Sequence, residues 1–242
     1  MGQVITQLAL EDEEISIVAG IDSAPGPDPG YPVFESFEAC TVQADVIVDF
    51  SSPKVFDSLV DHAVANRIPA VVCTTGLTPE QTARLQEESA RSAFLRSANM
   101  SLGINLLQKL VADAVRTLGP AGFDVEIVEQ HHNRKKDAPS GTALALADSI
   151  NEAAGGQYEY IYDRSGRSAA RDKKELGISA VRGGTITGIH EVIFAGTQET
   201  ITITHTAYSR TVFAKGALQA AKFLAGKAPG MYDMSDVIEA AQ

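Results

Sequence analysis

The sequence predicts an α/β protein in which an open parallel sheet is followed by a second, α+β domain. Two observations carry this prediction. Up to about residue 100, short apolar runs alternate with amphipathic helical segments, which is typical of a parallel sheet covered by helices on both faces. Between residues 178 and 206, β-branched segments follow one another without intervening helices, which indicates a mixed or antiparallel sheet.

The N-terminal elements are predicted to form part of a Rossmann-like dinucleotide-binding unit. A short amphipathic helix is expected over residues 3–12, and a strand is expected over residues 15–21, ending at Asp22. An acidic residue at the end of such a strand accepts a hydrogen bond from a ribose hydroxyl of the dinucleotide. The Asp22 carboxylate also repels a 2′-phosphate, so the sequence leans towards NADH while leaving use of both NADH and NADPH open.

The rest of the parallel sheet is read from alternating segments. Strands are expected over residues 44–50, 69–73 and 93–95, and helices over residues 54–66 and 79–90, the latter capped by Thr78. Ligands of such sheets bind beyond the carboxyl ends of the strands. The residues expected to contact the cofactor there are Phe50, Thr74, Thr75, Gly76, Ser97, Ala98, Asn99 and Met100. Each of these loops is weak evidence alone, because small polar residues are common at strand ends.

Residues 129–142 concentrate the chemistry of the chain. They follow an apolar strand expected over residues 123–129, and they lead into a helix for which Ser140 is the predicted N-cap. Gly141 and Thr142 then occupy the first helical turn, which is a binding site for an anion. Upstream of this turn lie His131, His132, Arg134, Lys135 and Lys136. A solvated basic loop is the plain alternative; a metal site is disfavoured because no Cys or carboxylate follows at ligand spacing.

Composition narrows the class of protein. The formal net charge of −11 argues against a nucleic-acid partner, and no apolar run is long enough to span a membrane. Cys40 and Cys73 are too few for a disulfide framework, so a reducing cytoplasm is expected. The polar segment 162–176 is expected to be mobile.

One motif carries a family resemblance. Residues 131–143 read HHNRKKDAPSGTA and match each fixed position of the pattern H-H-x-x-K-x-D-A-P-S-G-T-A, so the chain resembles the dihydrodipicolinate reductase (4-hydroxy-tetrahydrodipicolinate reductase) family. The resemblance runs over essentially the whole chain, with departures at Cys73 and Met100. It implies NADH- or NADPH-dependent reduction of 4-hydroxy-tetrahydrodipicolinate to tetrahydrodipicolinate, in the diaminopimelate route to lysine, by a cytoplasmic homotetramer.

The resemblance also assigns roles and boundaries. It implies that His131 and Lys135 handle protons, and that the carboxylates of a small dicarboxylate substrate are bound by His132, Gly141 and Thr142. It implies a dinucleotide-binding domain over residues 1–101 and 211–242, and a domain for substrate binding and oligomerisation over residues 102–210.

The start of the chain raises a further expectation. Met1 and Gly2 resemble only the last two residues of the family's G-x-x-G-R-M-G cofactor loop, so a strand and most of that loop, about 15 residues, are expected to be missing upstream. The corresponding expectation is that this form is poorly soluble or binds the cofactor weakly. Three alternatives stay open: a reductase of another dicarboxylate imine, a non-catalytic relative that binds the dicarboxylate only, and an oligomerising module.

Overall fold

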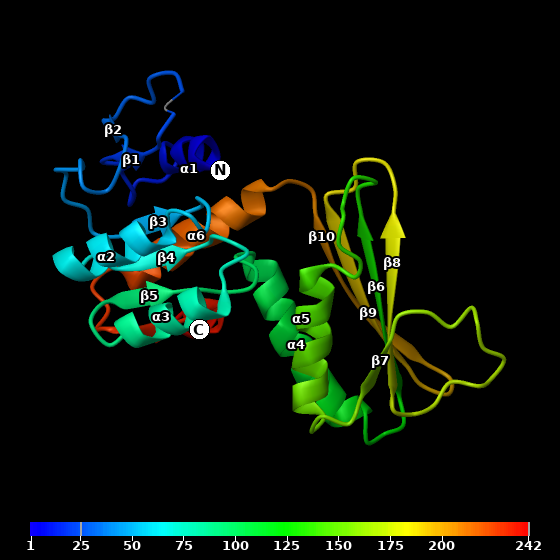
Figure 1. Cartoon of the computed structure of the whole chain (residues 1–242). Helices are drawn as coiled ribbons and strands as arrows, with labels where there is room; N and C mark the ends of the chain where they lie inside the picture. Colours follow the sequence, from blue (N-terminus) through cyan, green and yellow to red (C-terminus); the bar gives the residue numbers. More distant parts are fainter. Residues whose placement is uncertain (25, 242) are drawn as a thin grey trace. The chain divides into compact units, whose positions relative to one another are not determined.

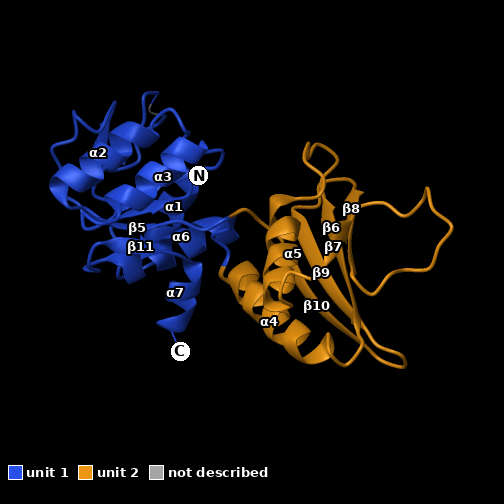
Figure 2. Cartoon of the chain, turned by 60° about the horizontal axis from the view of Figure 1, so that its bottom comes forward, with its two compact units in different colours: residues 1–101, 211–242 blue, residues 102–210 orange. Residues whose placement is uncertain are grey.

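The computed structural model describes residues 1–24 and 26–241 and divides into two compact units (Figure 2). Unit 1 comprises Met1–Ser101 and Thr211–Gln242, and unit 2 comprises Leu102–Arg210. Pro25 and Gln242, which fall within the predicted dinucleotide-binding domain, lie outside the described residues.

Unit 1 is built on a parallel sheet, as predicted (Figure 1). Its strands run in the order β11-β5-β4-β3 and are all parallel: β3 (Ile47–Asp49), β4 (Ala70–Val72), β5 (Ala93–Leu95) and β11 (Gly230–Tyr232). A separate parallel pair is formed by β1 (Gly20–Ile21) and β2 (Val33–Phe34). The carboxyl ends of β3, β4 and β5 therefore share one edge of the sheet.

Alternating side chains anchor helices on both faces of this sheet. On one face, Val72 and Phe94 pack against α2 (Phe56–Asn66) and α3 (Pro79–Glu88). On the other face, Val71 and Leu95 pack against α6 (Thr211–Leu224) and α7 (Met234–Glu239). The helix α1 (Gly2–Ala9) lies against α6 and β3 through Ile5. This double covering explains why β4 and β5 are continuous apolar runs.

Unit 2 is built on a mixed sheet, which confirms the predicted α+β character of this half. The strand order is β10-β9-β6-β8-β7. The elements in chain order are α4 (Leu102–Leu118), β6 (Asp124–His131), α5 (Gly141–Ala153), β7 (Glu159–Ile161), β8 (Glu175–Arg182), β9 (Gly188–Ala195) and β10 (Thr200–Ala207). β6 pairs in parallel with β8 and antiparallel with β9. One face of the sheet is covered by α4 and α5 through a core that includes Ile127, Leu146 and Phe194 (Figure 1).

Several predicted boundaries differ from the structure. The strand expected over residues 15–21 is limited to Gly20–Ile21, because only these residues pair with β2. The strand expected over residues 44–50 is limited to Ile47–Asp49, the residues that pair with β4. In contrast, β6 runs beyond the predicted end at residue 129 and includes His131.

The segment predicted to be mobile is tied to the sheet by arginines. Arg164 forms a bidentate contact with Glu126 of β6 and also reaches Glu175 of β8. Arg171 contacts Glu126, and Arg167 contacts Glu175. These arginines therefore have carboxylate partners on neighbouring strands, and the mobility of the segment stays a prediction.

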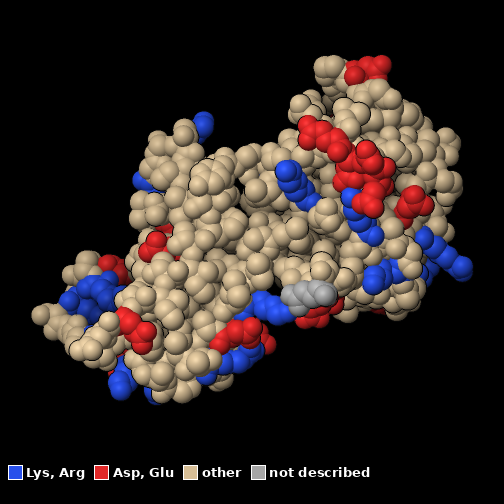
Figure 3. Space-filling model, turned by 180° about the vertical axis from the view of Figure 1, so that it is seen from behind, with Lys and Arg blue, Asp and Glu red and all other residues tan. Residues whose placement is uncertain are grey.

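Surface charge is intermixed on the face drawn in Figure 3, where acidic and basic side chains lie in small groups. Among the ion pairs of unit 1, Lys222 contacts both Asp12 and Glu14. Across residues 1–24 and 26–241, the structure has no helix with the length and apolar character needed to cross a bilayer.

Candidate active site

The site in unit 2 lies at the end of strand β6. Its side chains alternate between buried and half-buried, so Val125, Ile127, Glu129 and His131 all point to the side covered by the helices. The first two belong to the apolar core, whereas Glu129 and His131 continue the same row with ionisable groups. Glu129 is fully buried, and a buried carboxylate is retained only where donors satisfy it.

Those donors come from three elements. Arg182, at the end of β8, makes a bidentate contact with Glu129, with Nη1–Oε2 and Nη2–Oε1 distances of 2.8 and 2.6 Å. The backbone N–H of Ser140 donates to Glu129 Oε1 at 2.9 Å. His131 Nδ1 lies 2.6 Å from Glu129 Oε2. Burial opposes ionisation of Glu129, but Arg182, His131 and Ser140 outweigh it and hold the pKa of this carboxyl below its ordinary value.

His131 and His190 form the buried histidine pair of the site. Their ring centroids are 5.2 Å apart in an edge-to-face arrangement. Burial, together with Lys135 and Arg182, lowers the pKa of His131, while Glu129 opposes that shift. Burial, followed by the neighbouring His131, lowers the pKa of His190 to about 4. His190 is therefore neutral near pH 7, with its Nε2 3.1 Å from the Ser140 hydroxyl.

Helix α5 begins at this cluster, as the sequence predicted. Ser140 is the N-cap, and its hydroxyl accepts a hydrogen bond from the N–H of Ala143 at 3.1 Å. Gly141 and Thr142 take the first two helical positions, with Gly141 exposed and no atom within 4 Å of the place where a Cβ would stand. The first turn of a helix presents backbone N–H groups and a partial positive charge, so an anion can bind here.

The loop between β6 and α5, residues 132–139, carries the predicted lysine. Lys135 is half-buried, and its Nζ lies 2.9 Å from Asp137 Oδ2. Arg182 Nη2 donates to the Asp137 carbonyl at 2.8 Å, which fixes the loop to the end of β8. The Nδ1 atom of His132 is buried and has no hydrogen-bond partner among the described residues. Lys136, the next residue, is exposed.

A second group of predicted residues lies at the carboxyl edge of the parallel sheet in unit 1. Phe50 follows β3, residues 74–76 follow β4, and residues 97–99 follow β5. Thr75, Gly76 and Ala98 are exposed. Gly76 has a φ of 75°, which side chains rarely adopt, so this loop needs a glycine.

Met100 is placed differently from the other edge residues. Its side chain is buried in the core with Val71, Leu95 and Ala217. A Cβ on Gly216 would stand 1.7 Å from the Met100 carbonyl oxygen, so α6 packs directly onto this backbone. Met100 can therefore reach a ligand only through its backbone.

The residues near the N-terminus suit the phosphate and ribose ends of a dinucleotide. The N-cap of α1 is Met1, which makes no side-chain capping hydrogen bond, and Gly2 leaves open space at the first helical position. Asp22 follows β1 and is exposed, with one carboxylate oxygen accepting the N–H of Ala24. At the end of β3, Asp49 Oδ2 is buried and has no partner among the described residues, so it can accept a hydrogen bond from a ligand. This set of groups fits an NAD(P)H molecule.

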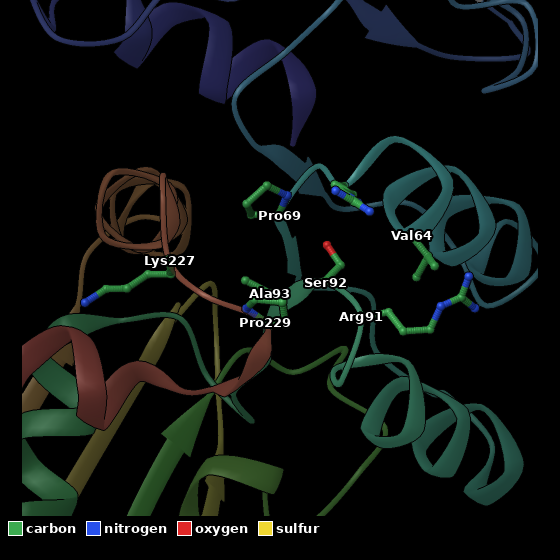
Figure 4. A pocket seen from close by; sticks show the side chains of 8 residues that line it. Val64, Pro69, Arg91, Ser92, Ala93, Lys227 and Pro229 are labelled. Carbon is green, nitrogen blue, oxygen red and sulfur yellow. The ribbon is translucent and has the colours of Figure 1, made fainter.

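A cavity of about 570 Å³ in unit 1 lies elsewhere. Figure 4 shows the residues that line it: Val64, Arg67, Pro69, Arg91, Ser92, Ala93, Lys227 and Pro229. Pro69, Ser92 and Pro229 immediately precede β4, β5 and β11, so the cavity sits at the amino edge of the sheet, opposite the edge where dinucleotides bind. No residue predicted for the site lines this cavity, and we do not assign the chemistry to it.

Sequence reasoning did not find all of the site. It gave no role to Glu129, and it did not consider His190, which reaches the site from β9. It also gave no role to Arg182. A signal for Glu129 was present, because the strand expected over residues 123–129 already placed it in the alternating row of Val125 and Ile127. Its neighbour His131 lay beyond the expected end of that strand.

Fold and site together define a two-domain, NAD(P)H-dependent oxidoreductase. Comparison with known proteins makes the assignment specific. A family model described as dihydrodipicolinate reductase, N-terminus, matches residues 1–100, and one described as dihydrodipicolinate reductase, C-terminus, matches residues 103–238. The chain belongs to the dihydrodipicolinate reductase family.

Individual relatives agree with this assignment. The 4-hydroxy-tetrahydrodipicolinate reductase of Caldanaerobacter subterraneus subsp. tengcongensis is 49% identical over 239 residues, covering 99% of this chain and 94% of the relative. That of Clostridium tetani is 47% identical over 234 residues, covering 97% of this chain and 91% of the relative. A dipicolinate-bound dihydrodipicolinate reductase from Paenisporosarcina sp. TG-14 superposes with a TM-score of 0.81 at 25% identity, covering 98% of this chain and 94% of that structure.

Proposed function

We propose that this chain reduces 4-hydroxy-tetrahydrodipicolinate to tetrahydrodipicolinate with NADH or NADPH, in the diaminopimelate route to lysine. The observation that carries the proposal is the arrangement at the end of β6, where His131, Lys135 and the N-terminus of α5 lie within one short segment. These groups supply proton donors beside an anion site, as the reduction of an unsaturated dicarboxylate requires.

Substrate binding is assigned to the start of α5. Gly141 and Thr142 would hold one carboxylate at the helix N-terminus, and His132 would donate to it from the preceding loop. The dipicolinate named for the Paenisporosarcina structure is an aromatic dicarboxylate of the same class, which supports a small dicarboxylate as the ligand.

Proton handling is assigned to His131 and Lys135. Loss of water from the 4-hydroxy substrate leaves a conjugated imine; addition of one hydride and one proton to it gives the product. His131 is buried beside a carboxylate, and Lys135 is a half-buried ammonium, so either can hold a proton away from bulk water. The bound nicotinamide cofactor supplies the hydride.

The cofactor is assigned to unit 1. Met1 and Gly2 would bind the phosphates at the start of α1, and Asp22 would bind the ribose. The nicotinamide would lie at the edge formed by Phe50, Thr74, Thr75, Gly76, Ser97, Ala98, Asn99 and the backbone of Met100.

Assembly and location complete the proposal. The face of the unit 2 sheet away from α4 and α5 exposes apolar side chains such as Val181, and we assign a homotetramer to contacts made through this face. Cys40 and Cys73 are free thiols, which fits a cytoplasmic enzyme.

A coupled assay tests the function. Freshly made product of dihydrodipicolinate synthase is supplied with NADH or NADPH, and absorbance at 340 nm is followed. We expect consumption of the nucleotide to depend on the dicarboxylate and to stop when dipicolinate is added in excess. Binding of dipicolinate without any nucleotide oxidation would overturn the reductase assignment and leave a dicarboxylate-binding protein.

A further inference from the structure

The Glu129 carboxylate is saturated with donors. Its Oε1 accepts from Arg182 Nη2 at 2.6 Å and from the Ser140 N–H at 2.9 Å. Its Oε2 accepts from Arg182 Nη1 at 2.8 Å and lies 2.6 Å from His131 Nδ1. An ionised carboxylate can only accept hydrogen bonds, so Nδ1 of His131 must carry a proton.

Because Nδ1 keeps its proton, Nε2 is the ring nitrogen of His131 that can gain and lose a proton. In neutral imidazole one ring nitrogen is a donor and the other an acceptor, so Nε2 accepts a proton and later gives it up. Space beside Nε2 is kept by Gly188 of β9, because a Cβ there would stand 3.1 Å from that nitrogen. A small residue at this position allows another molecule to approach Nε2.

Arg182 extends the same contact to the lysine loop. It sits opposite His131 in the parallel register of β6 and β8. Besides Glu129, it donates to the carbonyl of Asp137, two residues after Lys135. One guanidinium therefore fixes both the partner of His131 and the loop that carries Lys135.

We propose that Glu129 and Arg182 are positioning residues, which together orient Nε2 of His131 for proton transfer and fix the loop of Lys135. The inference deepens the proposed function and rests on it for the identity of the proton acceptor. Glu129 itself contacts no substrate in this scheme, because its four hydrogen-bonding positions are used within the protein.

The contact between Glu129 and His131 also affects the pH dependence expected of the site. The charged groups and histidines facing His131 are Glu129 on its own strand, Arg182 on β8, His190 on β9 and Lys135 in the loop. Of these, Glu129 raises the pKa of His131, whereas burial, Lys135 and Arg182 lower it. Removing the carboxylate charge therefore moves the loss of the imidazolium to lower pH.

The first test reads the tautomer directly and needs no activity. In protein labelled with ¹⁵N in the histidine rings, the His131 signals are assigned by their absence from His131→Gln. Above the pKa of His131, we expect a protonated Nδ1 and an unprotonated Nε2. Glu129→Gln replaces one carboxylate oxygen by an amide N–H₂, which is a donor and cannot accept a hydrogen bond from Nδ1. The population of the tautomer protonated on Nδ1 is therefore expected to fall. A wild-type His131 protonated on Nε2 alone would overturn the proposal, whatever the protein is found to catalyse.

The second test separates positioning from general destabilisation. Glu126→Gln is the matched control, because Glu126 lies on the same strand and also makes a bidentate contact with an arginine, Arg164. We expect Glu129→Gln to lower kcat by tenfold or more with a smaller change in KM, and to move the falling limb of the pH–kcat profile to lower pH. Glu126→Gln is expected to leave that limb unchanged.

A double variant tests whether Glu129 acts through His131. If it does, adding Glu129→Gln to His131→Gln causes little further loss of turnover. Full additivity of the two losses, or an unshifted pH limb in Glu129→Gln, would overturn the proposal. Should Glu129→Gln not fold, Arg182→Lys keeps the charge but not the bidentate contact, and the same readouts apply. Failure of wild-type protein to oxidise nucleotide would instead count against the proposed function.

Discussion

Replacing Lys135 by alanine tests the proposed proton handling against a control one residue away. The Lys135 side chain is 20% exposed, and its ionic partner among the described residues is Asp137, whose side chain is 59% exposed. Ion pairs this accessible to solvent contribute about 0–1 kcal/mol to stability. We therefore expect Lys135→Ala to fold, with a thermal midpoint lowered by about 4 °C or less.

The expected effect on turnover is much larger. Proton transfer by a positioned side chain contributes about 10²–10⁴-fold to rate, which corresponds to about 3–5 kcal/mol of activation free energy. Lys135→Ala is therefore expected to lose about two to four orders of magnitude in kcat. Lys136 is exposed, and Lys136→Ala is expected to change kcat by about twofold at most.

The assay follows nucleotide oxidation at 340 nm over a range of dicarboxylate concentrations, so that kcat and KM are obtained separately. Thermal unfolding of the two variants is measured alongside. Equal turnover in Lys135→Ala and Lys136→Ala would refute the role given to Lys135. A loss of turnover that follows a loss of folded protein would refute it equally.

Three further predictions concern the cofactor, acid stability and the core. Asp22→Ala is expected to raise kcat/KM for NADPH relative to NADH, whereas Asp28→Ala, in an exposed residue of the following loop, should leave this ratio unchanged; a constant ratio in both would contradict the ribose assignment. Arg167, the backbone N–H of Asp172 and Arg164 hold the pKa of Glu175 at about 2, below its ordinary 4.5. This carboxylate therefore stabilises the fold above pH 4.5, and the contribution is lost as pH falls towards 2. Glu175→Gln should weaken that pH dependence of the unfolding midpoint, and an identical dependence would count against it. Leu146 is fully buried, and Leu146→Ala is expected to cost about 2–5 kcal/mol of unfolding free energy in urea melts, with a cost below 1 kcal/mol arguing against the described core.

Much of the fold could be predicted because local patterns encode it. The helix after β4 is an example: Thr78 and Pro79 predicted its start, and Thr78 does form a capping box with Gln81. Ser140 likewise was predicted as an N-cap and is one. These contacts lie within three residues of one another, so the sequence displays them directly.

Elements that depend on distant pairing could not be predicted in the same way. The strand β11 covers only Gly230–Tyr232 and exists because it pairs with β5, far away in the chain. The strand expected over residues 15–21 is shortened for the converse reason, since only its last two residues have a ladder partner. Local propensity gives no information about such partners.

The candidate site likewise has parts that local sequence patterns predict and parts that depend on distant strand pairing. The segment with His131, Lys135 and Gly141 was visible as a motif, and the roles given to these residues stay predictions. The contact of Arg182 with Glu129 joins residues 53 positions apart and depends on the register of β6 with β8. No local pattern specifies that register, so the contact between Glu129 and Arg182 was found only in the three-dimensional structure.

The most direct test of the central claim is the fate of the hydride. Nucleotide carrying deuterium at the transferable position of the nicotinamide is incubated with the protein and 4-hydroxy-tetrahydrodipicolinate, and the product is analysed by mass spectrometry. The proposed function predicts tetrahydrodipicolinate containing one deuterium for each nucleotide oxidised. Nucleotide oxidation without label in this product, or no oxidation by well-folded protein, would contradict it.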